Sequence, residues 1–262
     1  MKVLFVADIV GSCGMDIAEK YIRRLKKDEK IDFVIANGEN AAPKNGINQE
    51  LYRRLIFAGC DCVTLGNHSF DNAEILDFID HTPELIRPYN YPKGTPGGGW
   101  YLIDGGKNRL AVISLMGNVY VSNLISPFEI IDDLLAEIKK DAPNTAIFID
   151  FHAEATSEKR ALGFYLDGKI SALFGTHTHV QTADSQILKN GTGYITDLGM
   201  TGPADSCLGV KTEIIIDRLK NGGAARFEQA DGRKMLNGCI FEIDRASGKT
   251  VGTERIYIEE RN

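Results

Sequence analysis

Short apolar runs alternate with amphipathic stretches over most of this chain. The amphipathic stretches repeat at helical spacing, as in Ile17, Ala18, Tyr21, Ile22 and Leu25. Alternation of this kind is typical of an α/β architecture. Buried strands are predicted at six apolar runs, residues 3–7, 33–36, 62–65, 110–115, 145–151 and 170–174.

Two helices have recognisable ends in the sequence. Asn48 is placed to cap a helix that Gly59 closes. Ser126, followed by Pro127, begins a second helix that runs towards Lys140. These signals predict where the two helices that connect strands of the sheet begin and end.

The pattern changes near residue 235. Two apolar runs, 236–243 and 253–258, flank a turn-rich stretch and predict an antiparallel hairpin. We expect this hairpin to be scaffold that completes a second sheet. No linker, repeat or low-complexity tract interrupts the sequence, so residues 1–262 are predicted to form a single domain.

Polar residues that can bind metal follow several of the apolar runs. Four of the five histidines are among them. The carboxyl ends of parallel strands form one rim of a sheet, and ligands bind at that rim in open α/β sheets. We therefore predict a dinuclear metal site with oxygen and nitrogen ligands. His68, next to Asn67, is expected to reach into the cleft, where it can donate a proton. The candidate metal ligands are Asp8, Glu39, Asn40, Asn67, His152, His177 and His179.

Some of these residues have structural alternatives when taken alone. Glu39 and Asn40 could cap a helix or brace a loop. His177 and His179 are expected in an extended segment, where alternate side chains face one cleft and each imidazole can take one metal. Asp71 could orient His68, but with Asn72 and the following residues it also matches a capping box opening a helix to residue 78, and we expect the capping role.

The composition narrows the partners. A formal net charge of -6 and a pI near 5.5 argue against binding to duplex nucleic acid or an anionic membrane. No apolar run approaches the roughly 18 residues of a membrane span, so a soluble, cytoplasmic protein is expected. The five cysteines form no paired framework and are expected to be buried, reduced thiols.

The order of the polar motifs resembles the calcineurin-like metallophosphoesterase superfamily, and more closely its YmdB-type branch. The likeness covers essentially the whole chain. Relative to the wider superfamily, Val10 replaces a ligand histidine, Glu39 replaces the bridging Asp, and Asn40 fills the vacated position. Met15 stands where an Arg is expected. The blocks that carry the likeness are Asp8-Ile9-Val10-Gly11, residues 37–41, residues 152–159, residues 175–184 and residues 197–203.

The resemblance implies an α/β sandwich of two β-sheets flanked by helices, with two transition-metal ions at the sheet ends. Iron or manganese, divalent or mixed-valence, is favoured, with zinc as an alternative. A hydroxide bridging the metals would attack phosphorus, and His68 would protonate the leaving oxygen as general acid. The implied ligands are Asp8, Glu39, Asn40 and His179 for the first metal, and Glu39 as bridge, Asn67, His152 and His177 for the second.

The implied activity is hydrolysis of small phosphodiesters, 2′,3′-cyclic or 3′,5′-cyclic nucleotides, by a chain that can form a homo-oligomer. A phosphomonoesterase would need a basic clamp, and the motif blocks supply no Arg. An RNA-end nuclease would need a basic track that the acidic chain lacks. A regulatory protein that binds metal and nucleotide with little turnover is a further alternative, although His68, which is not needed as a ligand, favours an enzyme.

Overall fold

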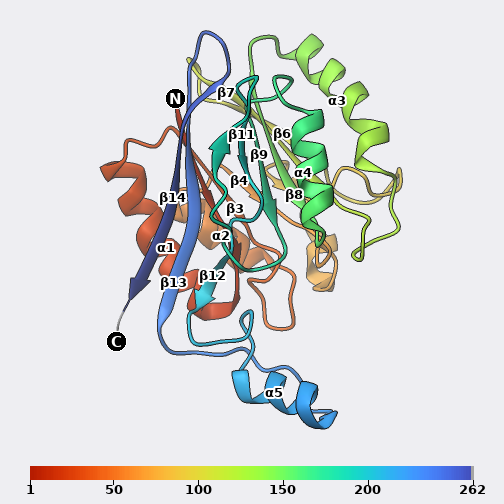
Figure 1. Cartoon of the computed structure of the whole chain (residues 1–262), viewed down its shortest axis with the longest axis vertical. Helices are drawn as coiled ribbons and strands as arrows, with labels where there is room; N and C mark the ends of the chain where they lie inside the picture. The colour runs from red at the N-terminus through yellow and green to blue at the C-terminus, as the bar shows by residue number, and fades with distance from the viewer. Residues whose placement is uncertain (261–262) are drawn as a thin grey trace.

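Two mixed β-sheets lie face to face between helices in the computed structural model, which describes residues 1–260 (Figure 1). In the described part of the chain the first sheet has eight strands, in the order β2-β12-β13-β1-β3-β4-β5 with β14 beside β13. Its strands are β1 (Lys2–Val6), β2 (Asp8–Ile9), β3 (Phe33–Asn37), β4 (Cys62–Thr64), β5 (Leu85–Ile86), β12 (Met200–Pro203), β13 (Lys234–Ile243) and β14 (Thr250–Glu260).

The second sheet has six strands within the same residues, in the order β10-β11-β9-β8-β7-β6. Its four central strands are parallel, and antiparallel strands close both edges. The strands are β6 (Trp100–Asp104), β7 (Arg109–Met116), β8 (Ala146–His152), β9 (Ala172–Thr176), β10 (Gln186–Ile187) and β11 (Gly193–Ile195).

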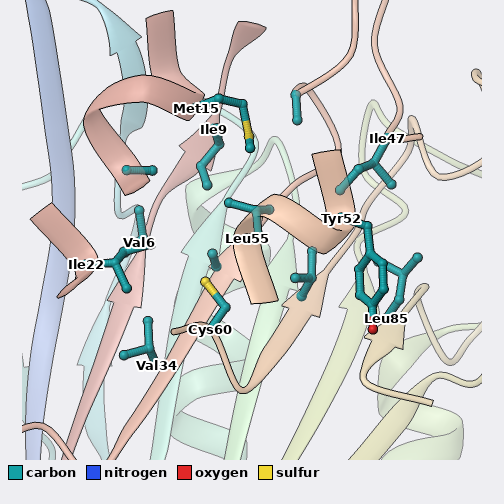
Figure 2. Close-up of a cluster of buried hydrophobic side chains, with 14 of the residues drawn as sticks. Val6, Ile9, Met15, Ile22, Val34, Ile47, Tyr52, Leu55, Cys60 and Leu85 are labelled. Carbon is teal, nitrogen blue, oxygen red and sulfur yellow. The ribbon is translucent and has the colours of Figure 1, made fainter. Parts of the chain in front are cut away.

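Helices cover the outer faces of both sheets. Helices α1 (Gly11–Asp28) and α2 (Gln49–Ala58) bury their apolar sides on the first sheet, and Figure 2 shows Met15, Ile22 and Leu55 in that core. Helices α3 (Pro127–Asp141) and α4 (Thr156–Tyr165) cover the second sheet. The remaining elements are α5 (Thr212–Asn221) and the 3₁₀ helices η1 (Ala73–Asp77) and η2 (Ile79–His81).

An aromatic core joins the two sheets. The ring centroid of Phe5 lies 5.4 Å from that of Phe148 and 6.1 Å from that of Phe241, and Phe174 packs against the same ring. All four side chains are almost completely buried. Each contributes roughly 2–3 kcal/mol of hydrophobic stabilisation. This core packs β1 of the first sheet against β8 and β9 of the second, and therefore holds the ends of those strands close together.

Several predictions from the sequence are confirmed. The Asn48 side chain accepts a hydrogen bond from Leu51 N at 2.9 Å, and Gly59 ends α2 with φ of 113°. Helix α3 begins after Ser126, although the serine side chain makes no capping hydrogen bond. Met15, at the position where an Arg was expected, is fully buried on the inner side of α1, so it contributes packing and no phosphate contact.

The C-terminal hairpin is confirmed, but its predicted place was wrong. β13 pairs antiparallel with β1, so the hairpin extends the first sheet instead of completing the second. β3 already occupies one edge of β1, and β13 fills the other. Alternate β13 side chains then face opposite layers: Phe241 enters the core between the sheets, while Ile240 packs towards α1.

The cysteines and the helices bear on two predictions made from composition. The five cysteines are free thiols, and all except Cys207 are buried. Within residues 1–260, no helix combines the length and apolar character needed to cross a membrane.

Candidate metal centre

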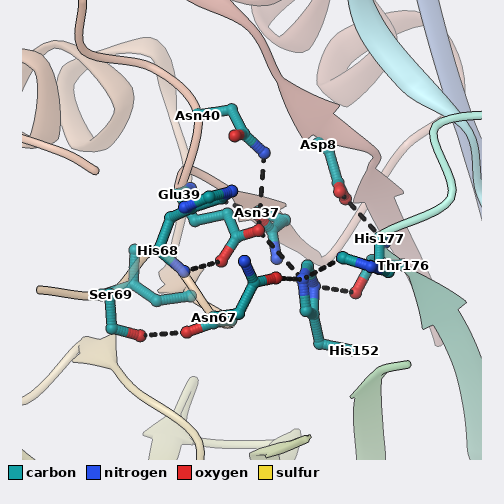
Figure 3. Close-up of polar contacts among 12 residues, drawn as sticks. Asp8, Asn37, Glu39, Asn40, Asn67, His68, Ser69, His152, Thr176 and His177 are labelled. Carbon is teal, nitrogen blue, oxygen red and sulfur yellow. Dashed lines mark hydrogen bonds and ion pairs between the residues drawn. The ribbon is translucent and has the colours of Figure 1, made fainter. Parts of the chain in front are cut away.

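Strand ends from both sheets bring the candidate ligands to one rim (Figure 3). Asp8 begins β2 directly after β1, and Glu39 follows the end of β3. Asn67 follows β4, His152 is the last residue of β8, and His177 comes directly after β9. The site therefore belongs to neither sheet alone, and the aromatic core beneath it fixes the spacing of its parts.

Three donor atoms from other residues converge on the Nε2 atom of His152. The Nε2 atom of His152 lies 2.8 Å from Asn67 Oδ1, 2.9 Å from Glu39 Oε1 and 3.0 Å from His177 Nδ1. Donor atoms of Glu39, His152 and His177 all lie within 4.8 Å of one another. Carboxylate, amide and imidazole groups gathered around one point form the donor set of a transition-metal site. These are the four residues predicted for the second metal.

The residues predicted for the first metal lie beside this cluster. His179 Nε2 is 3.3 Å from Asp8 Oδ2 and 3.4 Å from Asn40 Nδ2. As an oxygen ligand Asn40 would present Oδ1, which requires a half-turn of its amide. Asp8 is completely buried, and its Oδ1 atom has no hydrogen-bond partner among the described residues. A buried carboxylate oxygen without a partner is costly, and a cation would satisfy it.

The protonation of the two neighbouring imidazoles differs. Burial lowers the pKa of His152, but the Glu39 and Asp8 carboxylates outweigh this effect and raise the pKa to about 9. Burial and the adjacent His152 lower the pKa of His177 to about 4. His177 is therefore neutral at pH 7, the form that ligates metal. A cation bound among these donor atoms would displace the proton from His152 Nε2, because a ring nitrogen ligates metal only when it carries no proton.

The outward nitrogen of each histidine is also held. The Thr176 hydroxyl donates to Asp150 Oδ1 at 2.7 Å, so it accepts from His152 Nδ1 at 2.9 Å. His177 Nε2 lies 3.2 Å from Glu154 Oε2. These contacts fix each ring so that its other nitrogen faces the cluster. Asp150 carried no recognised signal in the sequence, whereas Thr176 and Glu154 each lie inside one of the motif blocks.

A buried ion pair supports the loop after β9. Lys159 Nζ donates to Asp197 Oδ2 at 2.6 Å and to Thr176 O at 2.8 Å, and the same Asp197 oxygen accepts from Thr178 N at 3.1 Å. Both side chains are buried, with exposed fractions of 0% and 1%. The pair fastens the backbone on both sides of His177.

The extended backbone predicted for residues 177–179 was wrong. His177 and His179 both have left-handed backbone, with φ of 96° and 62°. Because the chain turns here, the two imidazoles diverge: His177 meets His152, and His179 meets Asp8. The two rings still contact different donor residues, as one ligand for each metal requires.

The capping role predicted for Asp71 was also wrong. Asp71 Oδ2 lies 2.7 Å from His68 Nδ1, and Asn72 is the residue that caps η1, by accepting from Glu74 N. The segment to residue 78 forms the 3₁₀ helix η1 instead of an α-helix, and a second 3₁₀ helix, η2, follows it. Asp71 therefore orients the imidazole of His68, whose side chain is 30% exposed beside the metal cluster.

Gly66 explains the start of the Gly66-Asn67-His68 motif. A Cβ atom at this position would lie 2.4 Å from the His152 ring, too close for any side chain. The glycine thus lets the loop after β4 pass directly against a candidate ligand. Asn67 then reaches that ligand, while the His68 backbone N–H donates to Glu39 Oε2 at 3.0 Å.

Comparisons with known proteins agree on one family. A family model described as YmdB-like protein matches residues 4–256. The chain is 50% identical to the 2′,3′-cyclic-nucleotide 2′-phosphodiesterase of Bacillus subtilis over 260 residues, 99% of this chain and 98% of that protein. The alignment leaves almost no residue of either chain unmatched.

Two solved structures share the fold over the full chain. A hypothetical protein from Thermus thermophilus superposes with a TM-score of 0.92 at 37% identity, covering 99% of this chain and 100% of that chain. A phosphatase from Mycoplasma pneumoniae gives 0.93 at 32% identity, covering 100% and 94%. These matches confirm the fold and the enzyme class, a phosphodiesterase, that the motifs predicted, and the chain belongs to the YmdB-like family of calcineurin-like phosphoesterases.

Proposed function

We propose that this chain hydrolyses 2′,3′-cyclic nucleotides to nucleoside 3′-monophosphates at a dinuclear metal centre. The observation that carries the proposal is the convergence of donor atoms from Glu39, Asn67, His152 and His177 next to the unpartnered Asp8 Oδ1. The Bacillus subtilis relative, a 2′,3′-cyclic-nucleotide 2′-phosphodiesterase, supports the choice of substrate and of the bond that breaks.

The seven candidate ligands would hold two metal ions, with iron or manganese favoured and zinc as the alternative. When bound, two such ions supply positive charge for the phosphate and activate a water molecule. In the overall reaction the oxygen of water joins phosphorus, the bond between phosphorus and the 2′ oxygen breaks, and the 2′ oxygen gains a proton. The fixed rings of His152 and His177 mean that this centre needs little rearrangement before substrate binds.

His68 is the proposed donor of that proton. Its Nδ1 faces Asp71, which leaves Nε2 free of the carboxylate, and Asn45 Nδ2 lies 3.3 Å from both ring nitrogens. His68 lines a cavity of about 620 Å³ that is also lined by the candidate ligands Asn40 and His179. A substrate phosphate at the metal centre would therefore have its leaving oxygen on the His68 side.

The charge of the site favours diesters over monoesters. A diester carries one negative charge, whereas a monoester carries about two and needs a stronger basic clamp. Among the described residues, no arginine lines the cavity, and Lys44 is the cation there. The proposal also places the enzyme in the cytoplasm, because its five cysteines are free thiols.

The test is a turnover screen on purified protein whose metal content has been measured. The substrates are 2′,3′-cyclic AMP, 3′,5′-cyclic AMP, bis(p-nitrophenyl) phosphate and p-nitrophenyl phosphate. We expect two transition-metal ions per chain, diesters faster than the monoester, and the 2′,3′-cyclic nucleotide yielding the 3′-monophosphate. A monoester that wins by a wide margin would instead indicate a phosphomonoesterase, and nucleotide binding without turnover would indicate a regulatory protein.

A further inference from the structure

Residues 204–233, which we call the arm, form one wall of the cavity beside His68. A backbone hydrogen bond from Ala204 N to Arg233 O closes the base of the arm at 2.7 Å. α5 lies at its far end and projects from the body of the molecule (Figure 1). Backbone hydrogen bonds between residues 209–211 and 228–230 place two extended segments side by side at the cavity.

The arm is fixed against the first motif block of the chain. A Cβ atom on Gly11 would lie 2.4 Å from the Gln229 side-chain oxygen, and Gly11 has φ of 60°. A Cβ atom on Gly209 would lie 2.6 Å from Val10. The glycines thus permit close packing between the arm and the start of α1. This packing gives Gly11 a structural role in the first motif block.

Strained backbone concentrates around this cavity. Of the eight non-glycine residues with positive φ in the described chain, four line it: Lys44, Asn45, His179 and Leu208. Left-handed backbone is unfavourable for such residues and persists where surrounding structure enforces it, often at functional sites. One of these residues, Leu208, also contacts a candidate ligand: its backbone carbonyl accepts a hydrogen bond from His179 Nδ1 at 3.2 Å. The arm is therefore linked to a candidate metal ligand.

The arm presents apolar surface to the cavity. Leu208 is 52% exposed and Phe227 is 57% exposed, which is unusual for side chains that line a cavity. The Arg218 guanidinium lies 4.5 Å from the centroid of the Phe227 ring. This contact supports the aromatic ring, which stays largely exposed and lines the cavity. The cavity thus has metal donors at one end and a supported aromatic ring in its arm wall.

We propose that this cavity is the nucleobase subsite, in which Phe227 and Leu208 hold the base of the substrate while its phosphate lies at the metal donors. The inference rests on the proposed function and names how the same site recognises its substrate. An aromatic ring and an aliphatic side chain in the lining of one cavity suit the flat face of a base, and stacking on an aromatic ring tolerates any base. The volume of about 620 Å³ is typical of a small-molecule site.

A neighbouring cavity provides the matched control. It has a volume of about 520 Å³ and shares Leu208 and His179 with the first cavity, but among the described residues its lining lacks His68 and Asn40. Tyr257 lines it and is 57% exposed, the same fraction as Phe227. The two aromatic residues therefore differ in the cavity that they line and not in their exposure.

The kinetic test compares 2′,3′-cyclic AMP with ribose 2,3-cyclic phosphate, which has no base, in the metal-loaded full chain. Phe227→Ala should lower the ratio of kcat/KM for the nucleotide over the base-free ester by roughly 5- to 100-fold, mainly through KM. Phe227→Trp should restore the ratio, and Tyr257→Ala should leave it unchanged. An unchanged ratio in Phe227→Ala, or a fall in Tyr257→Ala instead, would overturn the subsite.

A binding measurement separates this proposal from the proposed function. Adenosine 3′-monophosphate and ribose 3-phosphate are titrated into the wild type, Phe227→Ala and Tyr257→Ala by calorimetry. A preference for the nucleotide that only Phe227→Ala loses supports the subsite even if cyclic nucleotides are not hydrolysed, in which case the proposed function alone fails. Equal binding of both ligands by the wild type overturns the subsite even if turnover is normal.

Discussion

The metal donors and the arm form opposite sides of one site but are built in different ways. Asp8, Glu39 and His152 are at most 1% exposed and stand on strand ends that the aromatic core joins. In the arm, by contrast, α5 has no buried residue, and Leu219 is 84% exposed. Groups on rigid elements hold precise geometry, and regions with few buried contacts can change without unfolding the rest. The chemistry therefore depends mainly on the strand ends and the proposed recognition of the base mainly on the arm, and the hydrogen bond between His179 and Leu208 joins the two.

The strongest test of this contrast is the removal of a donor. Asp8→Ala should lower the metal content of the purified protein and reduce kcat/KM by at least about a thousandfold, because the charge that holds metal on one side is lost. Elemental analysis and diester turnover measure the two effects. Full activity of the variant, or of the wild type held in chelator after metal removal, would contradict the donor assignment.

His68 stands between the two regions, and its replacement should affect chemistry alone. His68→Gln should keep both metals and lower kcat for 2′,3′-cyclic AMP by about 10²–10⁴-fold, the usual contribution of general acid catalysis. A nitrophenyl diester needs little protonation of its leaving group, so its rate should fall much less. The measurement is the ratio of mutant to wild-type rates for both substrates at matched metal content.

Two results would contradict this role for His68. Equal losses on both substrates would show that the imidazole acts on phosphate charge and not on the leaving oxygen. A lost metal would show that it supports the assembly of the centre.

Lys159 tests the claim that the donor side depends on global packing. Lys159→Met leaves Asp197 buried without its partner, which should reduce the free energy of unfolding by about 3–5 kcal/mol and lower Tm by about 10 °C. Burial already raises the pKa of Asp197, and loss of the lysine raises it further. Protonation of Asp197 at lower pH removes the unpaired buried charge, so the difference in free energy of unfolding between the variant and the wild type should become smaller as the pH falls. Chemical denaturation at several pH values measures this.

The chain offers a matched control for Lys159. Lys169 pairs with Asp132 at 2.8 Å on the surface, and Lys169→Met should change stability by less than about 1 kcal/mol. A double replacement, Lys159→Met with Asp197→Leu, should recover much of the stability without recovering metal binding, because the loop around His177 has lost its hydrogen bonds. Similar losses in the two single lysine variants would contradict the special role of the buried pair.

The smallest effect is expected in the arm. Leu219→Ser replaces an almost fully exposed leucine of α5 and should change the free energy of unfolding by no more than about 0.5 kcal/mol. Thermal unfolding and diester turnover should both match the wild type. A loss of several degrees in Tm would mean that the arm packs against something in solution, and the contrast between the two regions would not hold.

Structural features that depend on one residue and its neighbours in the chain were predicted correctly from the sequence. Asn48 and Gly59 predicted a helix from local capping chemistry, and Asp8 and His152 predicted the rim because each follows a buried strand. Such features depend on interactions between residues close in the chain. Periodicity alone could not assign the C-terminal hairpin to a sheet, because pairing between β13 and β1 joins residues more than 200 positions apart.

The errors within the site have a similar origin. The turn at His177 is enforced by Lys159 and Asp197, which only the folded chain brings together, so spacing alone favoured an extended segment. Asp71 and Asn72 both suit a cap, and the position of the His68 ring decides between them. The arm wall was not predicted at all, because an exposed Phe227 has no recognisable pattern in the sequence.

The burial of Lys159 also makes the chain its own reporter of conformational opening. Its amine is fully enclosed, whereas lysines such as Lys20 and Lys211 face solvent. Amine-directed reagents would modify the surface lysines within the first minutes and reach Lys159 only when the layer between α4 and β9 separates. Mass spectrometry of the peptide that contains Lys159 would then give the opening rate of the donor side directly, with and without metal, and without an introduced probe.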